Sequence, residues 1–102
     1  MDRLGFVLSL EESHAGVLFD AIQDLAASRF TDPANLLGLA MAHEMGHLLL
    51  QSAAHSAAGI MRAQWLPKDL RDAEGGFLMF TREQDRLMRN EVRRRMAMAH
   101  KW

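Results

Sequence analysis

The sequence of 102 residues contains no cysteine, no tyrosine and only two prolines. Without cysteine, neither a disulfide nor a thiolate metal site can form, so a transition metal would have to be held by imidazole and carboxylate groups. The sequence also lacks an apolar run of the ~18 residues that span a bilayer, and its start lacks the apolar segment and cleavage site of a signal peptide. We therefore expect a soluble protein with no membrane partner, cytoplasmic by default.

The charges are nearly balanced, with 12 Lys and Arg residues against 13 Asp and Glu residues and a net charge of −1. The one basic run, Arg93-Arg94-Arg95, has no aromatic residues interleaved for base stacking, and cations near a helix C-terminus complement the helix dipole. We interpret this run as a solvated helix face and expect no nucleic-acid partner. The length and the 49% hydrophobic content predict one domain, 1–102, with a small core.

The hydrophobic pattern predicts an α+β domain. Short apolar runs on either side of the polar turn Glu11-Glu12-Ser13 are typical of a β-hairpin, and the later segments have helical spacing. The predicted elements are strands over 4–10 and 16–19, helices over 20–29 and 33–50, a turn at 66–68, a polar loop over 72–76 and a helix from residue 81.

The central helix is the clearest element. Thr31 or Asp32 can cap it, and Pro33 suits its first turn. From there to Leu50 it is apolar on nearly every face, which is typical of a buried helix. Polar groups in such a helix must be hydrogen-bonded or must bind something.

The final helix has its own start signal. Thr81 and Gln84 fit a capping box. We expect its apolar stripe to face the rest of the domain; the stripe consists of Met88, Val92, Met96 and Ala99.

The central helix carries the motif HExxH, as His43-Glu44-Met45-Gly46-His47. Residues four apart lie on one face of a helix, so two imidazole nitrogens can reach the same ion. Glu44 is offset by one position, where it can act as a base for a metal-bound water rather than as a ligand. The competing interpretation is a core helix with two hydrogen-bonded histidines and no metal.

A catalytic zinc usually has three protein ligands and an open position for water, and His55 is the nearest candidate for the third. In a continuous helix it would lie about 12 Å beyond His47, so the helix must end near Gln51 and the chain must turn back. The alternative is an acidic third ligand, for which Glu74 and Glu83 come before Asp69 and Asp72. We expect His14 and His100 to be surface residues, although either could be a fallback ligand.

This segment resembles the metzincin clan of zinc peptidases, in the style of matrix-metalloprotease catalytic domains. The resemblance rests on HEMGH, His55-Ser56 and Gly59-Ile60-Met61, within a stretch of about 36–65. It implies that His43, His47 and His55 bind one Zn²⁺ per chain, that Glu44 is the general base, and that Met61 lies in a turn beneath the metal.

The resemblance also implies a small metzincin-like fold, minimal or truncated. Its parts would be a short N-terminal hairpin or sheet remnant, a central active-site helix, a Met-containing turn and a C-terminal helix. The third histidine comes two residues later than in the usual pattern, and no glycine follows the second. From the residues alone, Met61 is more typical of core filler, Trp65 of a packing anchor, and Arg62 of a solvated side chain.

The predicted function is zinc-dependent endopeptidase activity on a peptide or protein substrate, through a metal-activated water. The strand over 4–10 could be the sheet edge on which an extended substrate lies. The alternative is a catalytically inactive zinc-bearing domain that binds a peptide or a partner protein. The sequence does not specify the oligomeric state.

Overall fold

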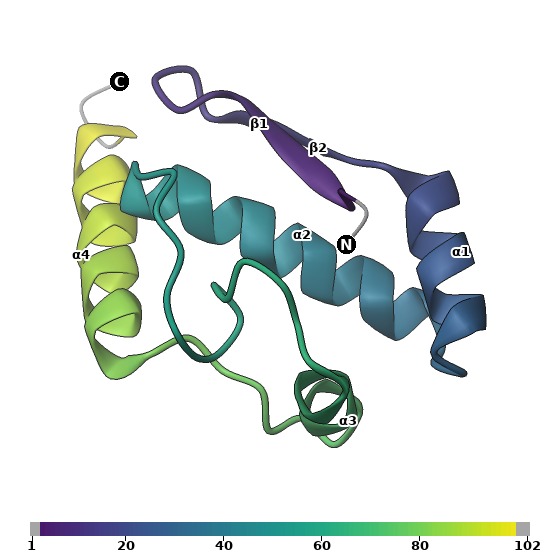
Figure 1. Ribbon diagram of the computed structural model, residues 1–102. Coiled ribbons are helices and arrows are strands. Elements are labelled where there is room, and N and C mark those ends of the chain that lie inside the picture. The colour runs from purple at the N-terminus through teal and green to yellow at the C-terminus, as the bar shows by residue number, and fades with distance from the viewer. Residues whose placement is uncertain (1–2, 100–102) are drawn as a thin grey trace.

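A central helix, α2 (Pro33–Leu50), organises the fold of the computed structural model, which describes residues 3–99. The hairpin lies along one side of α2, and the segment that follows α2 loops back along the opposite side (Figure 1). A two-stranded antiparallel sheet with helices confirms the predicted α+β class. The remaining elements are β1 (Gly5–Ser9), β2 (His14–Val17), α1 (Phe19–Ser28), α3 (Pro67–Glu74) and α4 (Arg82–Ala99).

The hairpin pairs Gly5 with Val17 and Phe6 with Gly16, with an irregularity between Val7 and Ser9. The predicted second strand, 16–19, was placed too late, because Ser13 adopts a positive φ of 57° that closes the turn and starts pairing at once. The strand therefore ends before α1 begins. α1 begins one residue earlier than expected.

Both ends of α2 lie where the sequence places them. The Asp32 carboxylate accepts a hydrogen bond of 2.9 Å from the Ala34 N–H, and Pro33 follows the cap. At the other end Gln51 adopts the left-handed conformation, with φ 51° and ψ 45°. A non-glycine residue there carries a conformational cost of about 1 kcal/mol, but the chain turns at the predicted position.

The predicted turn at 66–68 and loop over 72–76 are wrong, because a helix, α3, occupies most of this segment. Pro67 fixes φ in the first helical turn, and the Asp69 carboxylate accepts a hydrogen bond of 2.7 Å from the Leu66 N–H. Leu70 then faces the core at 8% exposure. Because this segment is mostly polar, the sequence does not predict the short helix with one buried side that the structure shows.

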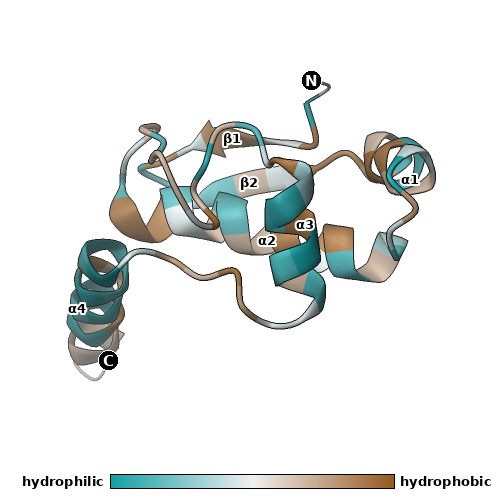
Figure 2. Ribbon diagram, turned by 60° about the horizontal axis from the view of Figure 1, so that its bottom comes forward, coloured by the Kyte–Doolittle hydropathy of each residue, from teal (hydrophilic) through white to brown (hydrophobic). Residues whose placement is uncertain are grey.

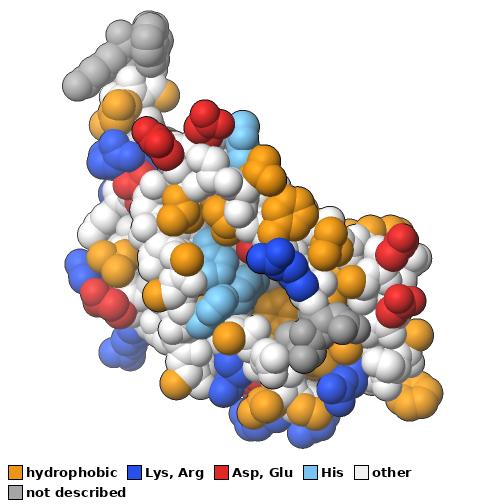
Figure 3. All heavy atoms as spheres, turned by 45° about the horizontal axis from the view of Figure 1, so that its top comes forward, with side chains coloured by type: hydrophobic (Ala, Val, Ile, Leu, Met, Phe, Trp, Pro, Cys, Tyr) orange, Lys and Arg blue, Asp and Glu red, His pale blue; other side chains and the backbone are white. Residues whose placement is uncertain are grey.

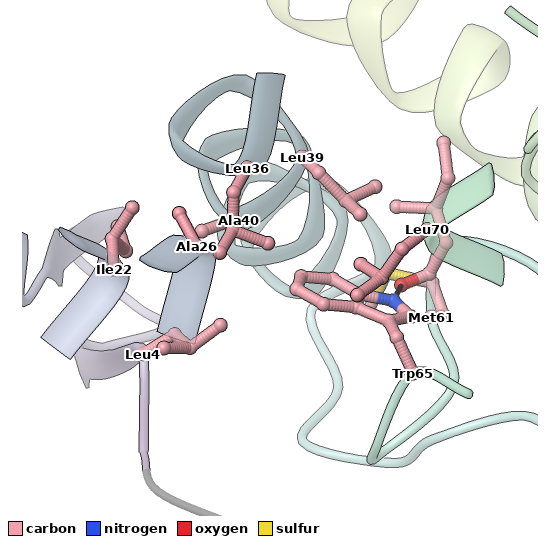
Figure 4. Close-up of a cluster of buried hydrophobic side chains, with 10 residues drawn as sticks. Leu4, Ile22, Ala26, Leu36, Leu39, Ala40, Met61, Trp65 and Leu70 are labelled. Atoms are coloured by element: carbon pink, nitrogen blue, oxygen red, sulfur yellow. Dashed lines mark hydrogen bonds between the residues drawn. The ribbon is translucent and has the colours of Figure 1, made fainter. Parts of the chain in front are cut away.

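The core lies between α2, α1 and the segment that returns beneath α2 (Figure 4). Ile22, Leu36 and Met61 are its largest fully buried side chains. The buried set is Leu4, Ile22, Ala26, Leu36, Leu39, Ala40, Ile60, Met61, Trp65 and Leu70.

In the described part of the chain, no helix combines the length and apolar character needed to cross a membrane.

α4 is strongly hydrophilic and packs near the C-terminal end of α2 (Figures 1 and 2). Its capping box is confirmed, with the Thr81 N–H 2.9 Å from Gln84 Oε1 and the Gln84 N–H 3.2 Å from Thr81 Oγ1. The predicted apolar stripe is wrong beyond Met88, which is half-buried. Val92 and Met96 are 40% and 57% exposed, whereas Glu91 and Arg95 are more buried.

The reason is that polar contacts, more than apolar packing, hold α4 in place. Arg95 donates to Ser13 Oγ at 3.1 Å and to the Leu48 carbonyl at 3.3 Å, so it joins the hairpin turn, α2 and α4. Glu91 accepts from Arg94 and Arg95, and these hydrogen bonds lower the pKa of Glu91 to about 2. Arg95 is thus the link between three elements.

We predict that Arg95→Ala lowers the free energy of unfolding by about 1 kcal/mol, because it removes hydrogen bonds between elements at a partly exposed site. The matched control is Arg93→Ala, since the hydrogen bond that Arg93 makes within the described residues is to Asn90, in its own helix. Urea unfolding of both variants is the measurement. Equal stabilities of the two variants would contradict the assignment.

Candidate metal centre

Three imidazole rings converge beside α2. His43 and His47 project from one face of the helix, and His55 comes from the segment that follows it. The ring centroids lie 4.8 Å apart for His43 and His47, 5.3 Å for His43 and His55, and 4.9 Å for His47 and His55. The predicted ligand residues are therefore brought together, and one candidate ligand atom from each ring lies within 4.8 Å of those of the other two.

The turn after α2 is what delivers His55. Once Gln51 reverses the chain, the Ser52 N–H donates to the His47 carbonyl at 3.2 Å. The Gln51 side-chain amide donates to the carbonyls of Leu10 and Leu48 at 2.7 and 2.6 Å, which holds the turn against the hairpin. These hydrogen bonds offset the strain of a left-handed glutamine.

Backbone carbonyls orient the two helical imidazoles. His43 Nδ1 lies 2.7 Å from the Ile60 carbonyl oxygen, and His47 Nδ1 lies 2.8 Å from the Ser52 carbonyl oxygen. A carbonyl oxygen only accepts, so each Nδ1 must carry the hydrogen. In the neutral rings, both Nε2 atoms therefore present lone pairs.

The two Nε2 atoms face each other at 3.2 Å. Two lone pairs repel at this separation, and no hydrogen bond joins them unless a ring is protonated. Nitrogens that share a tetrahedral zinc at 2.0–2.1 Å lie about 3.3 Å apart. The donor set therefore fits a divalent ion such as zinc, with three imidazoles and room for a further ligand.

The Glu44 carboxylate lies beside this cluster. Its residue is 9% exposed, and burial raises its pKa, against the opposing effects of His47, His55 and Arg3. No hydrogen bond to another described residue contributes to this shift in the pKa of Glu44. The carboxylate therefore borders the cluster as a desolvated group that is free to accept a proton.

The cluster opens into a cleft of about 410 Å³. Figure 3 shows the imidazoles at its base, with a cationic side chain at its edge. The lining comes from α2, from the segment after it and from β1, but not from β2. Besides the three histidines and Glu44, the charged side chain that lines the described cleft is Arg3.

Met61 lies in a tight turn, in which the Arg62 N–H donates to the Gly59 carbonyl at 3.1 Å. Its side chain is fully buried. Gly46, between the two helical histidines, is packed so closely against the Met61 sulfur that an added Cβ would overlap it. Met61 thus supports the helix under the histidines as well as filling the core, and Gly46 is a close-contact position that sequence reasoning missed.

Trp65 is buried at 8% exposure, as expected of a packing anchor. Its ring lies edge-on to His43, with centroids 5.5 Å apart and an interplanar angle of 89°. Its Nε1–H also donates to the Ile60 carbonyl at 3.1 Å, the same oxygen that accepts from His43. Trp65 therefore fixes the carbonyl that orients one candidate ligand.

The alternative acidic ligands lie elsewhere. Asp69 forms an ion pair with Arg62 at 2.9 Å, so Arg62 is not the solvated side chain that was expected. Glu74 accepts from Thr31, and Glu83 pairs with Arg86. Asp72 pairs with Lys68. Of the two fallback histidines, His14 is exposed and lies near Glu12, and His100 lies outside the described residues.

We predict that zinc affinity is nearly constant from pH 8 to about 6.5 and falls at lower pH. Burial lowers the pKa of His43 and of His55 below the ordinary value of 6.5, so protons compete with the metal for these two rings mainly below that value. Competition with a chromophoric chelator across this range measures the affinity. A tenfold loss already between pH 8 and 7 would contradict the prediction.

Comparison with protein-family models, with curated proteins and with solved structures finds no match for this chain.

Proposed function

We propose that the chain is a metzincin-like, zinc-dependent endopeptidase. His43, His47 and His55 would hold one zinc ion per chain, and Glu44 would be the general base. The observation that carries the proposal is the pair of Nε2 lone pairs 3.2 Å apart, because each ring is held in place by a carbonyl at its Nδ1. Such an arrangement is costly in a protein unless a cation neutralises it.

Zinc is the ion that we propose for this donor set. Imidazole ligands suit zinc, and three of them with an open position are typical of a hydrolytic rather than a structural site. A zinc ion there would supply Lewis-acid polarisation of the scissile carbonyl and would stabilise its oxyanion, for which this chain has no tyrosine.

Glu44 would carry the protons. As the water oxygen bonds to the carbonyl carbon, Glu44 accepts the water proton; as the C–N bond breaks, it gives that proton to the leaving nitrogen. The burial that raises its pKa makes it a stronger base than an exposed carboxylate. It also keeps the carboxyl protonated to a higher pH than an exposed carboxyl, so that the proton can be held until the leaving nitrogen takes it.

The hairpin would position the substrate. β1 borders the cleft, and among the described residues it pairs with β2 alone, so its other edge is open to a further strand. An extended peptide can add to such an edge through main-chain hydrogen bonds. Binding through the main chain would place a peptide bond across the cleft with little dependence on side chains.

We predict that His55→Ala weakens zinc binding at least about 100-fold, because it removes one of three ligands. The parent should bind one zinc per chain, measured by elemental analysis and chelator competition. His14→Ala is the matched control, since His14 is exposed and lies outside the cluster. Unchanged affinity in His55→Ala would contradict the ligand assignment.

We predict that Glu44→Gln retains zinc but loses cleavage by about 10²–10⁴-fold, because the amide cannot accept the water proton. The measurement is hydrolysis of an unfolded protein or a peptide library by the zinc-loaded protein. Glu83→Gln, which alters an exposed carboxylate on α4, is the control and should cleave like the parent.

Cleavage by Glu44→Gln at the parental rate would rule out its role as the base. A parent that binds zinc and cleaves nothing would instead support the second candidate, an inactive zinc-bearing domain that binds a peptide or a partner protein along the same cleft.

A further inference from the structure

β1 lies close to the Glu44 side chain of α2 at Gly5. A Cβ placed on Gly5 would lie 2.6 Å from Glu44 Oε2, 3.0 Å from Glu44 Cδ and 2.9 Å from the Gly16 carbonyl oxygen. Every other residue carries that atom, and carbon does not approach oxygen so closely without displacement. The Glu44 carboxylate can therefore occupy its position only because residue 5 lacks a side chain.

The backbone conformation does not explain this glycine. The described glycines with positive φ are Gly59 and Gly76, whereas Gly5 pairs with Val17 in the regular part of the hairpin. Glycine in a strand is destabilising relative to alanine, because it loses more conformational freedom on folding. The hairpin thus has a strand-weakening residue at a position where β1 meets the carboxylate.

The Glu44 carboxylate has few other restraints. No hydrogen bond to a described residue contributes to the shift in the pKa of Glu44. The charged neighbours that do contribute are His47, His55 and Arg3. A carboxylate with rotatable bonds and no hydrogen-bond partner is held mainly by packing. Gly5 provides that packing surface, because its bare backbone lies against the carboxylate on the side of β1.

We propose that Gly5 is a positioning residue: its bare backbone sets the place of the Glu44 carboxylate beside the three imidazoles. The inference rests on the proposed role of Glu44 as general base. The contact itself can be tested without any catalysis, so a failure of one can be told from a failure of the other.

A double-mutant cycle on metal-free protein tests the contact. Gly5→Ala should raise the unfolding equilibrium constant in the parent at least about fivefold more than it does in a Glu44→Ala background, where the Cβ has space. The contact with the Gly16 carbonyl exists in both backgrounds and cancels. Equal effects in the two backgrounds would overturn the proposal.

Kinetic measurements test whether the position of the Glu44 carboxylate matters for catalysis. Zinc-loaded Gly5→Ala should keep its zinc affinity within about threefold, should keep KM, and should lose kcat by about tenfold or more, because a small displacement of a base is costly. Gly16→Ala is the matched control on the partner strand. Its Cβ would meet the tip of the Phe6 ring, which can move, rather than Glu44.

A parental kcat in Gly5→Ala, or an equal loss in Gly16→Ala, would overturn the positioning role. If the parent itself cleaves nothing, the proposed function fails, and the stability cycle still decides whether Gly5 sets the place of Glu44.

Discussion

The orientation of two imidazole rings is the constraint on which the site depends. Because the Ile60 and Ser52 carbonyls each require an N–H from Nδ1, the rings of His43 and His47 cannot turn their Nε2 lone pairs away from each other. In the neutral rings these lone pairs repel each other, and a bound cation would relieve the repulsion. The same carbonyls would strengthen the imidazoles as ligands.

Two chain reversals build that constraint. The left-handed Gln51 ends α2 and places both the Ser52 carbonyl and the His55 ring, and the turn at Gly59–Arg62 places the Ile60 carbonyl. The second reversal is anchored by the buried Met61, by the Trp65 indole and by the ion pair of Arg62 with Asp69. The core and the site are therefore held by the same loop.

Much of this site could be predicted from the sequence, because helical periodicity fixes where His43 and His47 point and metal geometry demands that His55 returns to them. The contributions of backbone atoms could not be predicted from the sequence. A carbonyl that orients a ring has no side-chain signature, and the importance of Gly5 and Gly46 depends on contacts with Glu44 and Met61 that only the packed structure reveals. α3 was missed because its helix depends on a proline and a cap rather than on a long apolar stripe, and the inward face of α4 was missed because it is partly polar.

The most direct test of the account is a crystal structure of the zinc-loaded protein, with anomalous diffraction recorded at the zinc edge. The account predicts a single anomalous peak about 2.0–2.1 Å from a ring nitrogen of each of His43, His47 and His55, with the Glu44 carboxylate beside it and not bonded to it. A peak bound by only two of these rings, a peak at another cluster, or no peak at all would contradict it.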